Sequence, residues 1–235
     1  KLKEAYEKGE LSIENINTSV YRILKLILRS NKMKNYNFDN NPDLKKHAEI
    51  TRKSASEGMI LLKNEEMLPL KNVKTIALIG ATSFDFISGG TGSGDVEEAY
   101  TVSLEEALKN SDFEINQVSL NIFNSHFQSN KSDFKKYEGA IGTLMGMLNP
   151  YTPPEINYSV ESIKKIANSS DIAIITIGRN SGEGSDRVEI DDFLLSEKEI
   201  HMIKTTSEEF RSLGKKIVVV LNIGGTIETD SWKKY

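Results

Sequence analysis

Residues Asp171–Gly178 read Asp-Ile-Ala-Ile-Ile-Thr-Ile-Gly, a mostly β-branched run that ends at a glycine. Such an unbroken apolar run is typical of a strand buried on both faces, as in a parallel sheet covered by helices. Two similar runs occur elsewhere, at Thr75–Ile79 and Lys216–Asn222. Helices are predicted between these strands, because Ser103-Leu-Glu-Glu106 and Ser196-Glu-Lys-Glu199 are capping-box patterns. Strands alternating with capped helices predict an α/β layered sandwich with a mostly parallel sheet.

The N-terminal part of the chain carries a different pattern. Residues 1–33 are predicted to be helical, with Ser12 capping a helix whose apolar stripe requires a partner surface. Residues 34–46 are polar at first and are expected to form a linker. Asn41-Pro42 is a helix start signal, and the helix that follows is expected to run to about Gly58.

The sandwich domain is expected to occupy residues 47–235 and to be truncated at its C-terminus, because the chain stops soon after a buried strand. Inside it, Ile115–Leu120 alternates weakly and is predicted as a strand, and Ser159–Ala167 as a short amphipathic helix. The stretch 121–154 is punctuated by Gly, Asn and Pro and is predicted to be irregular, with one helix around 131–147.

Composition excludes several classes of function. The 235 residues are 38% hydrophobic and 27% charged, as in globular proteins, and the net charge of −4 gives no nucleic-acid footprint. No run approaches the roughly 18 apolar residues of a membrane span, so neither nucleic acid nor a membrane is expected as a partner. There is no cysteine, and His47, His126 and His201 show no metal-ligand spacing, so no metal or cofactor is expected. No targeting segment is visible, which leaves the compartment open between cytoplasmic and secreted.

The segment after the central strand, Ser181-Gly-Glu-Gly-Ser-Asp-Arg187, holds a candidate catalytic carboxylate. Ligands of open parallel sheets bind beyond the carboxyl ends of the strands. Glu183 stands between two glycines, where the backbone can approach a ligand closely, and Asp186 and Arg187 could pair to support the loop. The alternative interpretation is an ordinary polar loop with a solvated glutamate, which spacing alone favours.

A second loop, Gly89-Gly-Thr-Gly-Ser-Gly-Asp95, follows the strand at Thr75–Ile79 after a short interval. Its backbone amides could face an anion, but it matches neither a dinucleotide fingerprint nor a Walker loop. Thr91 and Ser93 are candidate hydroxyl partners for a polar ligand. A tight-turn loop without a ligand is the simpler interpretation of the glycines alone.

Taken together, these segments resemble family 3 glycoside hydrolases of the β-glucosidase type. The most specific match is Ile174-Ile-Thr-Ile-Gly-Arg-Asn-Ser-Gly-Glu-Gly-Ser-Asp-Arg187. The resemblance covers nearly the whole chain and is weakest at 121–154. The other segments, in the family's order, are Ser54-Ala-Ser-Glu-Gly-Met-Ile-Leu-Leu-Lys-Asn-Glu-Glu-Met-Leu-Pro-Leu70, Ile76–Gly80, Gly89–Asp95, Tyr100–Ser103 and Val218–Gly224.

The resemblance implies a function and the residues that carry it. Glu183 matches the general acid/base of a retaining, exo-acting β-glycosidase, and Ser93 matches a position that can reach the sugar. The nucleophile of such enzymes is an aspartate on a preceding (β/α)8 barrel, whose last helix residues 1–33 resemble. We therefore expect an internal piece of an enzyme that packs against that barrel, with a β-linked oligosaccharide or glycoside as substrate. A non-catalytic carbohydrate-binding module and a nucleotide-binding α/β module are the alternatives.

Overall fold

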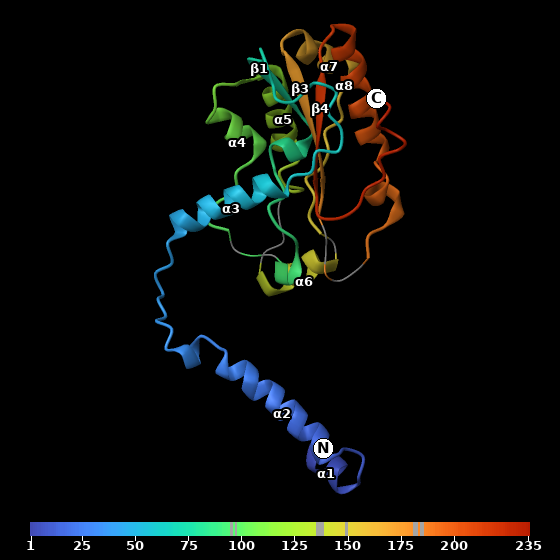
Figure 1. Cartoon of the computed structure of the whole chain (residues 1–235). Coiled ribbons are helices and arrows are strands. Elements are labelled where there is room, and N and C mark those ends of the chain that lie inside the picture. The colour runs from blue at the N-terminus through green and yellow to red at the C-terminus, as the bar shows by residue number, and fades with distance from the viewer. Residues whose placement is uncertain (95, 97, 135–138, 149, 181–182, 184–185) are drawn as a thin grey trace. The chain divides into compact units, whose positions relative to one another are not determined.

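A computed structural model describes residues 1–235 except 95, 97, 135–138, 149, 181–182 and 184–185, and leaves the side chains of residues 93 and 139–143 undescribed. The chain divides into two units, Lys1–Leu62 and Lys63–Tyr235 (Figure 1). The candidate site residues named above all belong to the second unit, which is called the sandwich unit below.

The first unit is helical. Ser12 caps its longest helix as predicted, since the Ser12 side chain accepts a hydrogen bond from Asn15 N at 3.2 Å. That helix has no buried residue, and its apolar side chains stay exposed, for example Ile23 at 58%. The unit contains α1 (Leu2–Glu7), α2 (Ile13–Leu28), the 3-10 turn η1 (Lys32–Lys34) and α3 (Leu44–Gly58).

The sandwich unit is built on a four-stranded sheet with the order β2-β1-β3-β4, in which all three pairings are parallel. This confirms the predicted α/β class and the predicted parallel pairing of the two central strands. In the register, Ile79 of β1 lies opposite Ile175 of β3, and Ile177 of β3 opposite Leu221 of β4. The strands are β1 (Thr75–Ile79), β2 (Glu114–Ile115), β3 (Ile172–Arg179) and β4 (Ile217–Ile223).

Both faces of the sheet are covered by apolar side chains, because alternate strand residues point to opposite faces. On one face Ile175 packs with residues of α7 and α8, and on the other face Ile174 packs with Leu108 of α4. Figure 1 shows these helices beside the sheet. None of the described helices is both long and apolar enough to cross a membrane. The helices are α4 (Leu104–Lys109), α5 (Gln117–Ser129), α6 (Gly139–Leu148), α7 (Val160–Asn168) and α8 (Glu197–Ser212).

The structure corrects two predictions of local structure and confirms a third in part. The predicted strand Ile115–Leu120 is wrong: β2 ends at Ile115, and α5 begins at once because the Asn116 side chain caps it, accepting from Ser119 N at 2.9 Å. The helix predicted around 131–147 is confirmed in part: residues 131–134 form a turn, 135–138 lie outside the described residues, and α6 spans Gly139–Leu148. The strand at β4 is half-buried rather than buried, since it has a pairing strand on one side only among the described residues.

Candidate active site

The carboxyl ends of β1 and β3 lie together at one edge of the sheet, because the two strands are parallel and in register. The segments that follow them are in close contact there. A Cβ at Gly178, near the end of β3, would lie 2.5 Å from Thr82 Oγ1 in the 3-10 turn η2 (Ala81–Ser83) that follows β1. Glycine at 178 therefore permits the two segments to approach each other.

Further along the same two segments, Glu183 meets the glycine-rich loop. Gly92 lies in the 3-10 turn η3 (Gly92–Gly94) with φ of +66°, and a Cβ at this position would lie 2.9 Å from Glu183 Cδ. The Glu183 side chain is exposed and packs against the backbone of this turn. The two predicted loops are thus brought together through Glu183 and Gly92.

The structure places the predicted hydroxyl residues beside this contact. Thr91 precedes Gly92 and is partly buried, and its carbonyl accepts a hydrogen bond from Gly94 N at 3.3 Å. Ser93 is the central residue of η3, but its side chain lies outside what the structure describes, as do residues 181–182 and 184–185 around Glu183. Asp95, the last residue of the predicted glycine-rich loop, also lies outside the described residues.

Hydrogen bonds from β4 and from Tyr151 hold the chain between β1 and the glycine-rich loop. Asn222 at the end of β4 accepts from Ile87 N at 2.8 Å and donates to Ile87 O at 3.1 Å, so its amide binds both backbone groups of Ile87. The Tyr151 hydroxyl donates to Asp85 Oδ2 at 2.5 Å, and Tyr151 O accepts from Asn180 Nδ2 at 3.1 Å. Burial, and then the hydrogen bond to Asp85, raises the pKa of Tyr151, so this hydroxyl keeps its proton.

Arg187, which follows the segment that carries Glu183, binds a carboxylate other than that of Asp186, its expected partner. Its Nη2 pairs with Asp192 Oδ1 at 2.7 Å. Arg187 also donates to Thr226 O, after β4. Asp192 lies in the short helical turn η4 (Glu189–Phe193), and no sequence pattern marked it. Arg187 pairs with Asp192 rather than with its neighbour Asp186 because the turn at 189–193 brings the Asp192 carboxylate back to the arginine.

A buried ion pair at the same edge was also missed. Arg179, the last residue of β3, donates to both carboxylate oxygens of Glu199, with distances of 2.6 and 2.8 Å, and each side chain is only 7% exposed. Glu199 also completes the predicted capping box with Ser196 at the start of α8. The capping-box pattern predicts the role of Glu199 at the start of α8. Its pairing with Arg179 depends on how β3 and α8 pack, which the pattern does not show.

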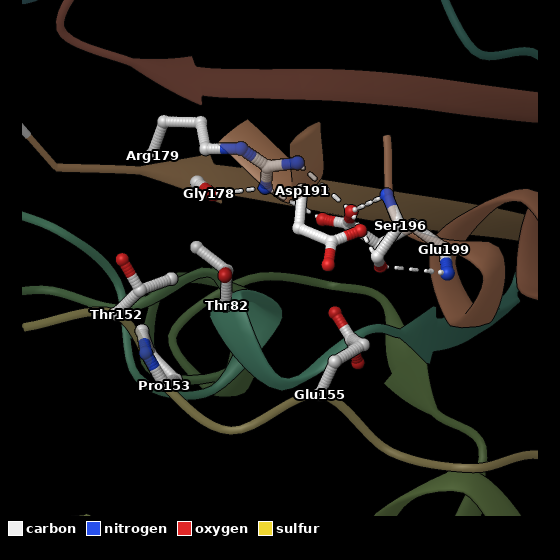
Figure 2. Close-up of a pocket in the computed structure, with 9 residues that line it drawn as sticks. All are labelled: Thr82, Thr152, Pro153, Glu155, Gly178, Arg179, Asp191, Ser196 and Glu199. Atoms are coloured by element: carbon white, nitrogen blue, oxygen red, sulfur yellow. Dashed lines mark hydrogen bonds and ion pairs between the residues drawn. The ribbon is translucent and has the colours of Figure 1, made fainter. Parts of the chain in front are cut away.

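Beside this ion pair lies a polar cavity of about 150 Å³ (Figure 2). Glu155 lines it and accepts hydrogen bonds from Ala81 N at 3.0 Å and Ile156 N at 2.8 Å. Burial outweighs these two bonds and raises the Glu155 pKa to about 7. Glu183 and Gly92 do not line this cavity, which is lined by Thr82, Thr152, Pro153, Glu155, Gly178, Arg179, Asp191, Ser196 and Glu199.

No group of three or more histidine or acidic side chains in the described part of the chain is arranged to hold a metal ion. Two carboxyl groups at this edge differ in their surroundings. Glu155 is held inside the cavity by backbone amides, whereas Glu183 is exposed beside the glycine-rich turn. An exposed carboxyl on a glycine-rich surface can exchange a proton with a ligand bound there.

Comparisons with known proteins identify the family of this chain. The profile of the Glycosyl hydrolase family 3 C-terminal domain matches residues 59–235. Beta-glucosidase A of Butyrivibrio fibrisolvens is 32% identical over 80% of this chain and 24% of its own length. Thermostable beta-glucosidase B of Acetivibrio thermocellus is 30% identical over 97% of this chain and 26% of its own length.

Solved structures agree as well. Beta-glucosidase 3B of Thermotoga neapolitana, in complex with α-D-glucose, superposes with a TM-score of 0.81 and 36% identity over 99% of this chain and 32% of that one. The chain thus spans about a quarter of the length of the curated relatives it matches. The family profile covers the whole sandwich unit, and the chain therefore belongs to glycosyl hydrolase family 3, with residues 59–235 matching its C-terminal domain.

Proposed function

We propose that this chain contributes the general acid/base, Glu183, to a retaining, exo-acting β-glycosidase of the β-glucosidase type that hydrolyses terminal β-linked sugars. The observation that carries the proposal is the contact of the exposed Glu183 carboxyl with Gly92 at the carboxyl edge of the sheet. The two relatives described above are both β-glucosidases, and the Thermotoga neapolitana enzyme has been solved with glucose.

The chemistry needs a second carboxylate. In retaining glycosidases the two carboxyl groups stand about 5–5.5 Å apart; one attacks the anomeric carbon and the other protonates the leaving oxygen and later activates water. We assign the second role to Glu183 and the nucleophile to an aspartate of a (β/α)8 barrel outside this chain. Residues 1–33 are proposed as the last helix of that barrel, 34–46 as the linker, and 47–235 as the domain that packs against the barrel.

Two hydroxyl residues are proposed to bind the sugar. Ser93 and Thr91 flank Gly92, whose backbone contacts Glu183, so a sugar that reached the Glu183 carboxyl would lie beside them. Hydrogen bonds from hydroxyl side chains hold a sugar in a fixed orientation while a proton is transferred. Asp186 and Arg187 are proposed to support the segment, with Arg187 acting through the Asp192 contact described above.

Replacement of Glu183 by Ala in the full reading frame tests the acid/base role. Glycosides with poor leaving groups should lose about 10²–10⁴-fold in kcat/KM, the usual contribution of a general acid. Activated aryl glycosides should lose much less, because their leaving groups need little protonation. Added azide should speed turnover where release of the glycosyl enzyme limits the rate, with formation of a glycosyl azide.

Glu189→Ala is the matched control, since Glu189 is an exposed carboxylate on the same stretch of chain. It should behave as the unsubstituted enzyme. Equal loss on both classes of substrate for Glu183→Ala, without an azide effect, would assign Glu183 a structural role and remove the proposal.

A further inference from the structure

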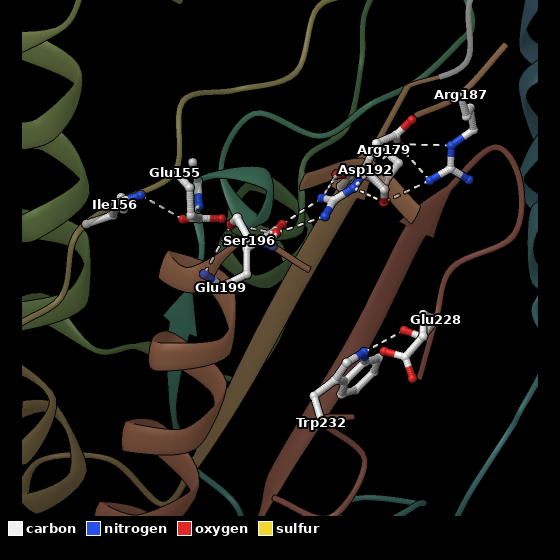
Figure 3. A network of polar contacts seen from close by, with 11 residues as sticks. Glu155, Ile156, Arg179, Arg187, Asp192, Ser196, Glu199, Glu228 and Trp232 are labelled. Carbon is white, nitrogen blue, oxygen red and sulfur yellow. Dashed lines mark hydrogen bonds and ion pairs between the residues drawn. The ribbon is translucent and has the colours of Figure 1, made fainter. Parts of the chain in front are cut away.

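The two arginines that flank the Glu183 segment bind one and the same residue, Asp192 (Figure 3). Arg179 precedes the segment and donates from Nε to Asp192 O at 2.8 Å. Arg187 follows it and donates from Nη2 to the same oxygen at 3.0 Å. The chain therefore leaves β3 at Arg179, which is bound to Asp192, and is bound to Asp192 again eight residues later, at Arg187.

The Asp192 side chain adds a second set of bonds on the returning side. Its Oδ1 accepts from Arg187 Nε at 2.9 Å and from Arg187 Nη2 at 2.7 Å, and its Oδ2 accepts from Val188 N at 3.2 Å. Arg179 Nε also lies 3.7 Å from Asp192 Oδ1. The Asp192 carboxylate thus faces both guanidinium groups, and the main-chain oxygen of Asp192 accepts one hydrogen bond from each of them.

Arg179, Asp192 and Arg187, called the clamp below, are attached to other elements of the fold. Arg179 is 7% exposed and is paired with Glu199 of α8. Asp192 and Arg187 are 22% and 23% exposed, so their charged hydrogen bonds are better shielded from water than surface ion pairs are. Glu228 N donates to Phe193 O at 2.9 Å, which ties the turn holding Asp192 to the segment after β4.

We infer that Asp192 is a positioning residue for Glu183, which holds the two ends of the Glu183 segment at a fixed separation so that the carboxyl stays against Gly92 at the sugar site. This inference rests on the proposed acid/base role of Glu183. A displacement of about 1 Å from a productive geometry can cost on the order of 10²-fold in rate. Arg179 and Arg187 each lie four positions from Glu183 in the sequence, so holding both arginines at Asp192 limits the positions open to Glu183.

Asp192→Asn tests the clamp in the full reading frame. The substitution keeps the main-chain oxygen and the side-chain size, but removes the negative charge between Arg179 and Arg187. We expect a loss of about tenfold or more in kcat/KM for glycosides with poor leaving groups, and at most about threefold for activated aryl glycosides, because only the former need an aligned acid. Glu189→Gln, the same chemical change on an exposed residue of the same turn, should leave both unchanged.

Arg187→Gln should show the same dependence on the leaving group. The double variant Asp192→Asn with Arg187→Gln should lose little more activity than the more damaged single variant, because both substitutions remove the same Arg187–Asp192 ion pair. Trapping of the glycosyl enzyme by an activated fluoroglycoside counts the folded sites, so unfolding is corrected for. A loss for Asp192→Asn that is equal on both substrate classes, or no loss at all, overturns the inference.

Measuring Glu183→Ala in parallel separates the two proposals. If Glu183→Ala shows the leaving-group dependence and the azide effect while Asp192→Asn does not, the acid/base role stands and the clamp is wrong. If Glu183→Ala shows neither, the acid/base role fails and the positioning role fails with it.

Discussion

Glu183 packs its carboxyl against the backbone of Gly92, so closely that a side-chain carbon at position 92 would lie 2.9 Å from Glu183 Cδ. The two residues are far apart in the sequence, but they follow neighbouring parallel strands, β1 and β3. The glycine therefore has two requirements to meet at once. It must adopt φ of +66°, which disfavours other residues, and it must leave space for the carboxyl group.

Gly92→Ala should displace Glu183 and strain the turn. We expect activity on glycosides with poor leaving groups to fall by about tenfold or more in the full reading frame, because the acid is moved away from the leaving oxygen. Gly94→Ala is the matched control, since among the described residues, its chain neighbours aside, no atom lies within 4 Å of a Cβ at Gly94. Kinetics on poor and activated substrates give the measurement. Equal activity of the two alanine variants would contradict the importance of the Gly92 contact.

The isolated chain should not hydrolyse nitrophenyl β-glucoside. The reason is that the proposed nucleophile lies on a barrel domain outside the chain, which spans about a quarter of its curated relatives. Purified chain is assayed beside the product of the full reading frame, at equal molar concentration. Turnover by the chain alone at the rate of the full-length protein would show that both carboxylates are within residues 1–235.

Glu155→Gln should change how stability depends on pH. Burial raises the Glu155 pKa from 4.5 to about 7, so between these values the folded state binds a proton that the unfolded state has released. The free energy of unfolding of the unsubstituted chain therefore falls as pH rises through this window, and the contribution is lost above the folded-state pKa. Glutamine stays neutral and can still accept from Ala81 N and Ile156 N.

Urea unfolding at about pH 5 and about pH 8 measures this effect. The stability of Glu155→Gln relative to the unsubstituted chain should be greater at the higher pH than at the lower one. A constant difference between the two proteins across the window would mean that the Glu155 carboxyl does not titrate there.

Arg179→Met should destabilise the sandwich unit strongly. It leaves Glu199, which is 7% exposed, without its cation, and breaking a buried pair costs about 3–5 kcal/mol. The double variant Arg179→Met with Glu199→Gln should lose less than the sum of the two single variants, because no charge is then left unpaired. Lys74→Met removes the exposed Lys74–Glu114 pair, whose side chains are 73% and 58% exposed, and should change the free energy of unfolding far less than Arg179→Met does. Strict additivity in urea unfolding would contradict a coupled pair.

Much of the secondary structure is local information, and the sequence alone predicts it. β1 matches the predicted range Thr75–Ile79, and β3 differs from Asp171–Gly178 by one residue at each end. Ser196 forms the capping box that the spacing of serine and glutamate predicts, since that interaction lies within one turn of helix. The parallel pairing of β1 with β3 also follows, because a helical connection returns the chain in the same direction.

The predictions of secondary structure and burial failed where a local pattern was weak or where a neighbouring element of the fold determined the result. The stretch Ile115–Leu120 alternates enough to resemble a strand, but the Asn116 cap starts α5 within it. The run Ile217–Ile223 is as apolar as a central strand, yet β4 is half-buried, because burial depends on which strand lies beside it.

The candidate site divides in the same way. A glutamate between two glycines after a buried strand, and a glycine-rich loop after another, are visible in the sequence and lead to Glu183, Thr91 and Ser93. Sequence did not reveal that Gly92 is the residue that Glu183 contacts, or that Arg187 binds Asp192 rather than Asp186. These are contacts between residues on different segments of the fold. Their partners are selected by the distances that remain after the sheet and its helices have packed, and no spacing along the chain encodes those distances.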